Sequence, residues 1–132
     1  MKLHFTILFF LIVDSASSQE VLWPTTLGKY FSSNFGENRD DHFHMGVDIK
    51  TSGKIGMEVL AVEDGYISRL RSNYKGYGKA IYQRTNSGHE VVYGHLEAFT
   101  PVMEKVWRLQ QAKRRSYIAV SYTHLTLPTT LV

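Results

Sequence analysis

The sequence predicts a mainly β fold, an antiparallel sheet with one helix. Four short segments alternate apolar and polar residues, as half-buried strands do, at residues 58–62, 65–71, 79–84 and 90–96. Turn-forming sequences such as Asn86-Ser87-Gly88 separate them. One stretch starts like a helix, at Thr100 and Pro101.

Strand pairing is predicted from the turns and the alternation. The Glu-Asp-Gly sequence at residues 63–65 lies between the first two segments, and an acidic residue followed by glycine between β-branched residues favours a hairpin. In the last segment, strict alternation places His95 on the same face as Val91 and Tyr93.

The helix is predicted over residues 101–114, because a good N-cap residue precedes a proline at the first helical position. Val102, Val106 and Leu109 are predicted to form its buried stripe. The methionine and tryptophan of this helix are interpreted as core residues rather than as part of a cofactor site.

Composition bounds the class of protein. The 132 residues suit a single domain, and the hydrophobic fraction of 43% and charged fraction of 20% are ordinary for a globular chain. The net charge of +3 favours anionic surfaces such as cell-wall polymers or phospholipid, but it is too small to indicate a nucleic-acid partner. We expect a monomer.

The first residues predict export. Basic Lys2 precedes the apolar run of residues 5–13, and small residues follow, so residues 1–18 are interpreted as a signal peptide. The apolar run is shorter than the about 20 residues that a membrane-spanning helix needs, so no stable membrane anchor is expected after removal. Without cysteine, neither a disulfide nor a lipid-modified cysteine is expected. Residues 19–34 are predicted to form an extended lead-in packed by its aromatic side chains.

His44 and Asp48 are the candidate metal ligands. Imidazole nitrogen and carboxylate oxygen are ligands of catalytic zinc, which takes three protein ligands and a water. A straight strand would separate the two residues by roughly 13 Å, so Gly46 is predicted to bend the chain and to leave room for the ion. The alternative is that His42 and His44 are exposed loop residues near surface carboxylates.

Several motifs follow one another within residues 35–117. They are Phe35-Gly36-Glu37, Arg39, His42-Phe43-His44-x-Gly46-x-Asp48, the Gly-x-x-Val-x-Ala-Val-x-Asp-Gly of residues 56–65, and Tyr93-Gly94-His95-Leu96. This ordered set resembles the lysostaphin-type (LytM) zinc endopeptidases, which cut peptide cross-links in bacterial cell walls.

The resemblance implies a partial peptidase domain at residues 35–119, with an incomplete antiparallel sheet of the duplicated hybrid motif. It implies that His44 and Asp48 bind zinc and that His95 is catalytic, orienting water or steadying the oxyanion without binding the metal. It also implies peptidoglycan peptides as the partner and the periplasm or cell envelope as the location. We expect His44, Asp48 and His95 to line one cleft.

The end of the chain differs from the rest. Residues 120–132 carry no charge, and this run resembles the translated end of a transposon adapter used for sequencing libraries, so it is predicted to be a non-native tail. The family's third zinc ligand lies in a His-x-His motif that is absent here, since Thr126 stands two residues after His124. No role is assigned to His124. As written, the chain is expected to bind zinc weakly and to be an inactive fragment.

Two other functions stay open at this stage. A non-catalytic LytM-like module that binds or regulates other cell-wall hydrolases would retain the fold without the activity. A biotinyl or lipoyl carrier domain shares the glycine and valine pattern of residues 56–65, but it needs a modified lysine at a hairpin tip, and residues 63–65 contain none.

Overall fold

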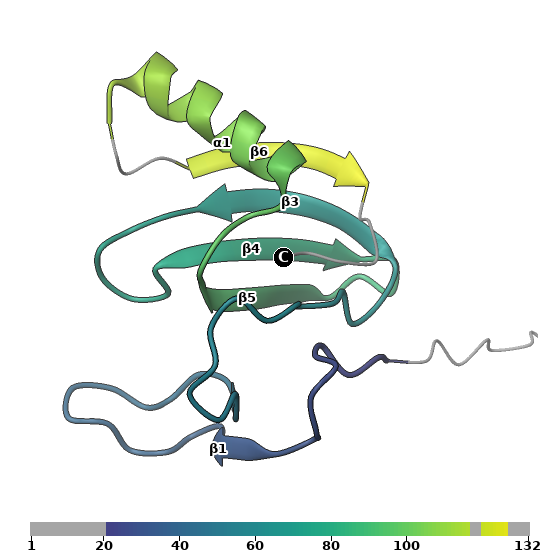
Figure 1. Ribbon diagram of the computed structural model, residues 1–132, viewed down its shortest axis with the longest axis vertical. Coiled ribbons are helices and arrows are strands. Elements are labelled where there is room, and N and C mark those ends of the chain that lie inside the picture. Colours follow the sequence, from purple (N-terminus) through teal and green to yellow (C-terminus); the bar gives the residue numbers. More distant parts are fainter. Residues whose placement is uncertain (1–20, 117–119, 127–132) are drawn as a thin grey trace, which may run out of the picture.

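The computed structural model describes residues 21–116 and 120–126 and has a mainly β fold with two antiparallel sheets and one helix (Figure 1). The small sheet pairs β1 (Phe31–Ser33) with β2 (Asp48–Ile49). The larger sheet has four strands in the order β5-β4-β3-β6. Its strands are β3 (Gly65–Arg71), β4 (Lys79–Thr85), β5 (Glu90–Leu96) and β6 (Val120–Thr126). The predicted fold class is therefore confirmed.

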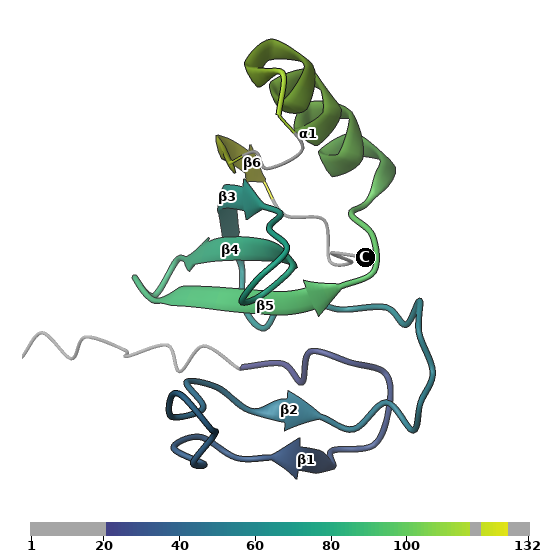
Figure 2. The same cartoon turned by 90° about the vertical axis from the view of Figure 1, so that its left-hand side faces the viewer.

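The small sheet lies beyond the β5 edge of the larger sheet, whereas the helix lies toward the β3–β6 side (Figure 2). Within the larger sheet, the loop of residues 72–78 joins β3 to β4 and residues 86–89 join β4 to β5, so these strands pair as consecutive antiparallel neighbours. The predicted strands at residues 65–71, 79–84 and 90–96 are confirmed, with β4 one residue longer.

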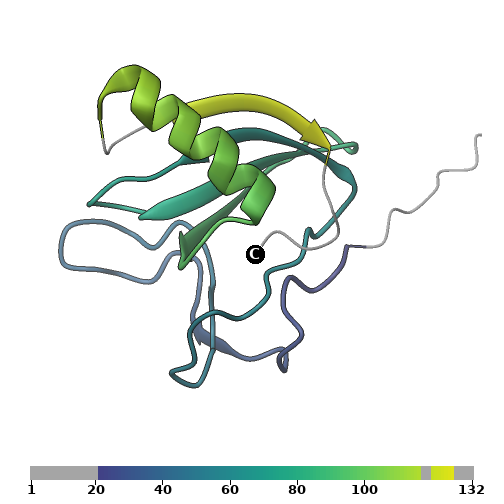
Figure 3. The same cartoon turned by 45° about the horizontal axis from the view of Figure 1, so that its top comes forward.

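The core lies between the larger sheet and α1 (Pro101–Arg114), which runs across the sheet (Figure 3). Ile67 and Leu70 of β3 both belong to it, although strict alternation would send residues three apart to opposite faces. A register irregularity between Ile67 and Arg69 inserts one extra residue at Ser68 and returns Leu70 to the core face. Both side chains are fully buried.

The helix has the predicted bounds, but its buried face is not the predicted one. Val102 and Leu109 are 65% and 63% exposed, so the stripe expected at Val102, Val106 and Leu109 is wrong. Met103 and Trp107 are buried instead, which confirms their interpretation as core. The larger apolar side chains decide the orientation, since they remove more apolar area from water. Thr100 occupies the N-cap position without a side-chain cap hydrogen bond.

The predicted strand at residues 58–62 and its hairpin with residues 65–71 are wrong. Residues 59–62 pair with the lead-in, through the bridge from Val59 to Thr25 and the hydrogen bond from the Leu22 N–H to the Val62 carbonyl at 2.7 Å. β3 pairs with β4 and β6 instead. A local pattern signals an extended chain but does not identify its partner.

In the described part of the lead-in, the rings of Trp23 and Phe31 lie 5.3 Å apart, and the chain bends at residues 24, 26, 27 and 29. The prediction missed β1, which lies within it. The predicted signal peptide falls outside the described residues. Residues 120–126 of the predicted tail form β6, which pairs with β3, and the origin of this tail stays a prediction. In the part of the chain that the structure describes, no helix is long and apolar enough to cross a membrane.

A buried polar network links the larger sheet to the chain before β3. The Tyr93 hydroxyl donates to Gln83 Oε1 at 2.5 Å and accepts from the Val62 N–H at 3.0 Å, while Gln83 Nε2 donates to the Glu63 carbonyl at 2.5 Å. Burial raises the pKa of the Tyr93 phenol above its ordinary value. The neutral phenol therefore contributes stability that is present below about pH 10 and is lost as the pH rises through the raised pKa.

Tyr93→Phe is expected to lower the free energy of unfolding by about 1–3 kcal/mol, because it leaves the Val62 N–H and Gln83 Oε1 without a partner. Urea unfolding at neutral pH measures the change. Tyr74→Phe, at a residue that is 84% exposed, is the control. A loss no larger than that of the control would contradict the role of the network.

Candidate metal centre

His44 and Asp48 lie on the return arm of a hairpin whose base is the β1–β2 sheet. At the base, Asp48 is the β-partner of Ser33. Nearer the tip, the His44 N–H donates to the Glu37 carbonyl at 2.8 Å, and the His44 carbonyl accepts from the Gly36 N–H at 2.7 Å. The backbone of both candidate ligands is therefore fixed by cross-strand hydrogen bonds.

The chain bends between these two residues and brings their side chains together. His44 Nε2 lies 3.3 Å from Asp48 Oδ1. Gly46 lies at a bend, as predicted, but it is not among the residues with positive φ, so the special backbone freedom of glycine is not what the bend uses. A Cβ at Gly46 would lie 4.0 Å from His44 Nε2, its nearest neighbour, which is an ordinary van der Waals distance and leaves room for a small side chain.

The hydrogen bonds of His44 determine which of its nitrogens faces Asp48 with a lone pair. His44 Nδ1 lies 2.9 Å from the carbonyl oxygen of Asn34 and 3.1 Å from Ser33 Oγ. A carbonyl oxygen only accepts, so Nδ1 carries the proton. In the neutral imidazole, Nε2 is then the unprotonated nitrogen, and its lone pair is directed toward Asp48. Two acceptor atoms this close favour a cation between them.

These two side chains fit a zinc ion. Ligands about 2.0–2.2 Å from a tetrahedral ion stand about 3.4 Å apart, which matches the separation of His44 Nε2 and Asp48 Oδ1. The bond from His44 Nδ1 to a backbone carbonyl is the usual support of a metal-binding histidine. Within residues 21–116 and 120–126, however, no group of three or more His, Cys, Asp or Glu side chains is placed to hold a metal ion.

Three further polar residues surround the pair: Ser33, Glu37 and Arg39. Arg39 Nη2 lies 3.0 Å from Asp48 Oδ2, 3.3 Å from Glu37 Oε2 and 2.6 Å from Ser33 Oγ. The Ser33 hydroxyl in turn donates to Glu37 Oε2. Sequence analysis assigned these residues no role, since a run of charged residues is usually a solvated turn. The only available signal was the place of Glu37 and Arg39 in the ordered motif, and Ser33 lies outside that motif.

His42 and His44 differ in their surroundings. His42 Nδ1 bonds Asp41 Oδ1 at 2.5 Å, with the two side chains 61% and 87% exposed, and this hydrogen bond lowers the pKa of Asp41. The alternative of an exposed loop histidine therefore describes His42. The His44 side chain is only 18% exposed.

His95 does not follow the predicted alternation. Tyr93 is buried and Val91 packs against the core, but His95 is exposed. Its φ is 57°, in the left-handed region, and the register shifts where β5 passes Lys79 and Ile81 of β4. One extra residue in β5 forms a bulge there and turns the imidazole away from the face of Tyr93.

The bulge is held by Tyr77 in the loop before β4. The His95 N–H donates to the Tyr77 carbonyl at 2.8 Å, and the two rings meet edge to face with centroids 6.4 Å apart. A Cβ at Gly94 would lie 3.0 Å from the Tyr77 ring, so any larger residue here would require that ring to shift. The structure thus brings His44 and Asp48 together. No hydrogen bond or ion pair joins His95 to either among the described residues, and their convergence on one cleft stays a prediction.

Comparison with known protein families matches residues 42–125 to peptidase family M23. The match contains His44, Asp48 and His95 and covers more than half of the chain. The chain belongs to peptidase family M23. No similar curated protein and no similar solved structure was found. This M23 domain is thus a peptidase domain by family.

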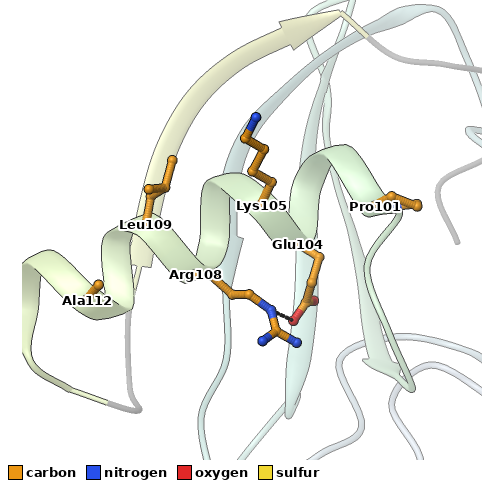
Figure 4. Close-up of a pocket in the computed structure, with 6 residues that line it drawn as sticks. All are labelled: Pro101, Glu104, Lys105, Arg108, Leu109 and Ala112. Atoms are coloured by element: carbon orange, nitrogen blue, oxygen red, sulfur yellow. Dashed lines mark ion pairs between the residues drawn. The ribbon is translucent and has the colours of Figure 1, made fainter.

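A hollow elsewhere on the M23 domain lies along α1 (Figure 4). Its lining includes Leu109 and the ion pair between Arg108 Nε and Glu104 Oε1 at 3.3 Å. None of its lining residues is a histidine, and none belongs to the hairpin. The two candidate ligands of the M23 domain are therefore not part of this hollow.

The strained backbone at His95 gives a measurable signature. His95→Gly is expected to be more stable than His95→Ala by about 1 kcal/mol, because a Cβ is unfavourable at positive φ. At Val92, which is not among the positive-φ residues, glycine is expected to be less stable than alanine by about 0.5–1 kcal/mol. Urea unfolding of the four variants measures these differences. If alanine were more stable than glycine at position 95, as is expected at position 92, the bulge at His95 would be excluded.

Proposed function

We propose that this domain is a zinc-dependent endopeptidase that hydrolyses peptide cross-links of bacterial peptidoglycan, and that it is exported to the periplasm or cell envelope. The observation that carries the proposal is the 3.3 Å approach of His44 Nε2 to Asp48 Oδ1 in a peptidase domain of family M23. Two acceptors held this close on a fixed hairpin are suited to share one cation. The resemblance to lysostaphin-type enzymes supports the choice of substrate.

His44 and Asp48 would hold the ion. When bound, zinc would supply Lewis acidity toward the scissile carbonyl and lower the pKa of a water at the site toward neutrality. The protein prepares its two donors in advance. The Asn34 carbonyl keeps the proton of His44 on Nδ1, and Arg39 binds Oδ2 of Asp48 and leaves Oδ1 facing the imidazole.

His95 is the candidate acid–base group. It does not belong to the pair that would bind the metal, and its side chain is exposed to solvent at the bulge of β5. Bulges beside active sites re-aim a side chain, and a non-glycine residue held at positive φ is a form of strain found at such sites. A positioned imidazole can move a proton or donate a hydrogen bond to a developing oxyanion, a contribution of roughly 2.7–4 kcal/mol for one well-placed donor.

Zinc binding tests the proposed ligands. The full chain is expected to bind one zinc ion weakly, since two donors leave the coordination incomplete. His44→Gln and Asp48→Asn should each abolish this binding in a calorimetric titration. His89→Gln, which removes a histidine of the turn before β5, should leave it unchanged. Equal loss in the His89 variant would show that the bound zinc is not at His44.

Peptide cleavage tests the reaction. Free imidazole can supply the missing donor, so zinc with imidazole is expected to make the chain release new amino groups from purified peptidoglycan. His95→Ala should lose this release while retaining the zinc binding. Zinc bound at His44 without any cleavage in imidazole would contradict the peptidase proposal and favour a non-catalytic module that binds other wall hydrolases.

A further inference from the structure

Arg39 is the centre of the polar network behind the two candidate ligands. Its Nη2 lies 2.6 Å from Ser33 Oγ, 3.0 Å from Asp48 Oδ2 and 3.3 Å from Glu37 Oε2. This one nitrogen therefore meets residues from β1, the hairpin tip and β2. The network links the outgoing arm of the hairpin, which carries Ser33 and Glu37, to the return arm that carries Asp48.

The network fixes both candidate ligands, each at the atom that would not touch the ion. Arg39 binds Oδ2 of Asp48, and Oδ1 is left 3.3 Å from His44 Nε2. Ser33 Oγ accepts from Arg39 and lies 3.1 Å from His44 Nδ1, while its own proton goes to Glu37. All these donors and acceptors are satisfied by one arrangement of protons, with His44 protonated on Nδ1.

The charges of the network also suit a cation. A guanidinium beside a carboxylate would by itself weaken that carboxylate as a metal ligand. Here Glu37 offsets Arg39, so with neutral His44 the three charged groups, Glu37, Arg39 and Asp48, sum to one negative charge. Arg39 can therefore orient Asp48 without cancelling its attraction for a divalent ion.

We propose that Arg39 is a positioning residue for zinc binding, which holds the Asp48 carboxylate in the rotamer that faces His44. This inference rests on the proposed function. Arg39, Ser33 and Glu37 all lie before residue 42, where the family match begins. Support of a metal ligand by a hydrogen-bonded neighbour typically changes metal affinity by about 10- to 100-fold.

A purely structural role makes a different forecast. The side chains of Arg39, Glu37 and Asp48 are 40%, 50% and 42% exposed, and ion pairs this exposed contribute little to folding. Replacement of Arg39 should therefore change the zinc affinity far more than the urea midpoint of the metal-free protein. Arg84 is a matched control, since it is 47% exposed and lies 3.9 Å from Glu90 Oε2 outside the hairpin.

The experiment is a zinc titration of the full chain, monitored by NMR through the ring signals of His44. These signals report even weak binding at this site. Arg39→Gln is expected to raise the half-saturating zinc concentration by about tenfold or more. Arg39→Lys keeps the charge and one nitrogen donor, so it should recover part of the loss. Glu37→Gln should also weaken binding, because it leaves Arg39 without its counter-charge. Arg84→Gln should match the wild type.

The outcomes separate the two proposals. If zinc does not shift the His44 signals of the wild-type chain, the proposed function fails. If zinc binds at His44 but Arg39→Gln binds it equally or more tightly, only the role of Arg39 is overturned. The zinc affinity and the urea midpoint of Arg39→Gln could also fall together, without recovery in Arg39→Lys. That result would overturn the positioning role of Arg39 in favour of a structural role.

Discussion

The carbonyl of Asn34 can only accept a hydrogen bond, and the orientation of the candidate site depends on this constraint. It keeps the proton of His44 on Nδ1, so that Nε2 faces Asp48 Oδ1 at 3.3 Å as an acceptor. The hairpin that carries Asn34 also carries both ligands and the supporting Arg39. One short stretch of chain therefore builds the site and its support.

The larger sheet presents His95, the proposed proton-transfer residue, by a different device. Tyr93 is anchored in the core by Gln83 and Val62, and two residues later the bulge exposes His95. A buried, hydrogen-bonded residue is thus followed two positions later by an exposed residue at positive φ. This combination gives a side chain a defined direction at the end of a strand, which is what a proton-transfer group requires.

Local features of the sequence predicted local features of the structure well. The helix at residues 101–114 and the strands β3 to β5 follow from a proline start and from period-two patterning. What failed depended on distant partners. Residues 58–62 pair with the lead-in, and α1 buries Met103 and Trp107 because the core selects the larger side chains.

The same distinction holds for the site. The bend between His44 and Asp48 could be predicted, because a straight strand would keep them apart. The role of Arg39 could not, because a charged run looks like a solvated turn until the register of the hairpin is known. The bulge at His95 was signalled only by Gly94, and an isolated glycine in a strand does not say which neighbouring side chain is redirected. The most direct test of the account is the tautomer of His44, read from the long-range proton–nitrogen NMR spectrum of the metal-free chain at about pH 8, where an ordinary histidine is neutral. We expect a proton on Nδ1 and none on Nε2. A proton on Nε2, donated to Asp48, would contradict it.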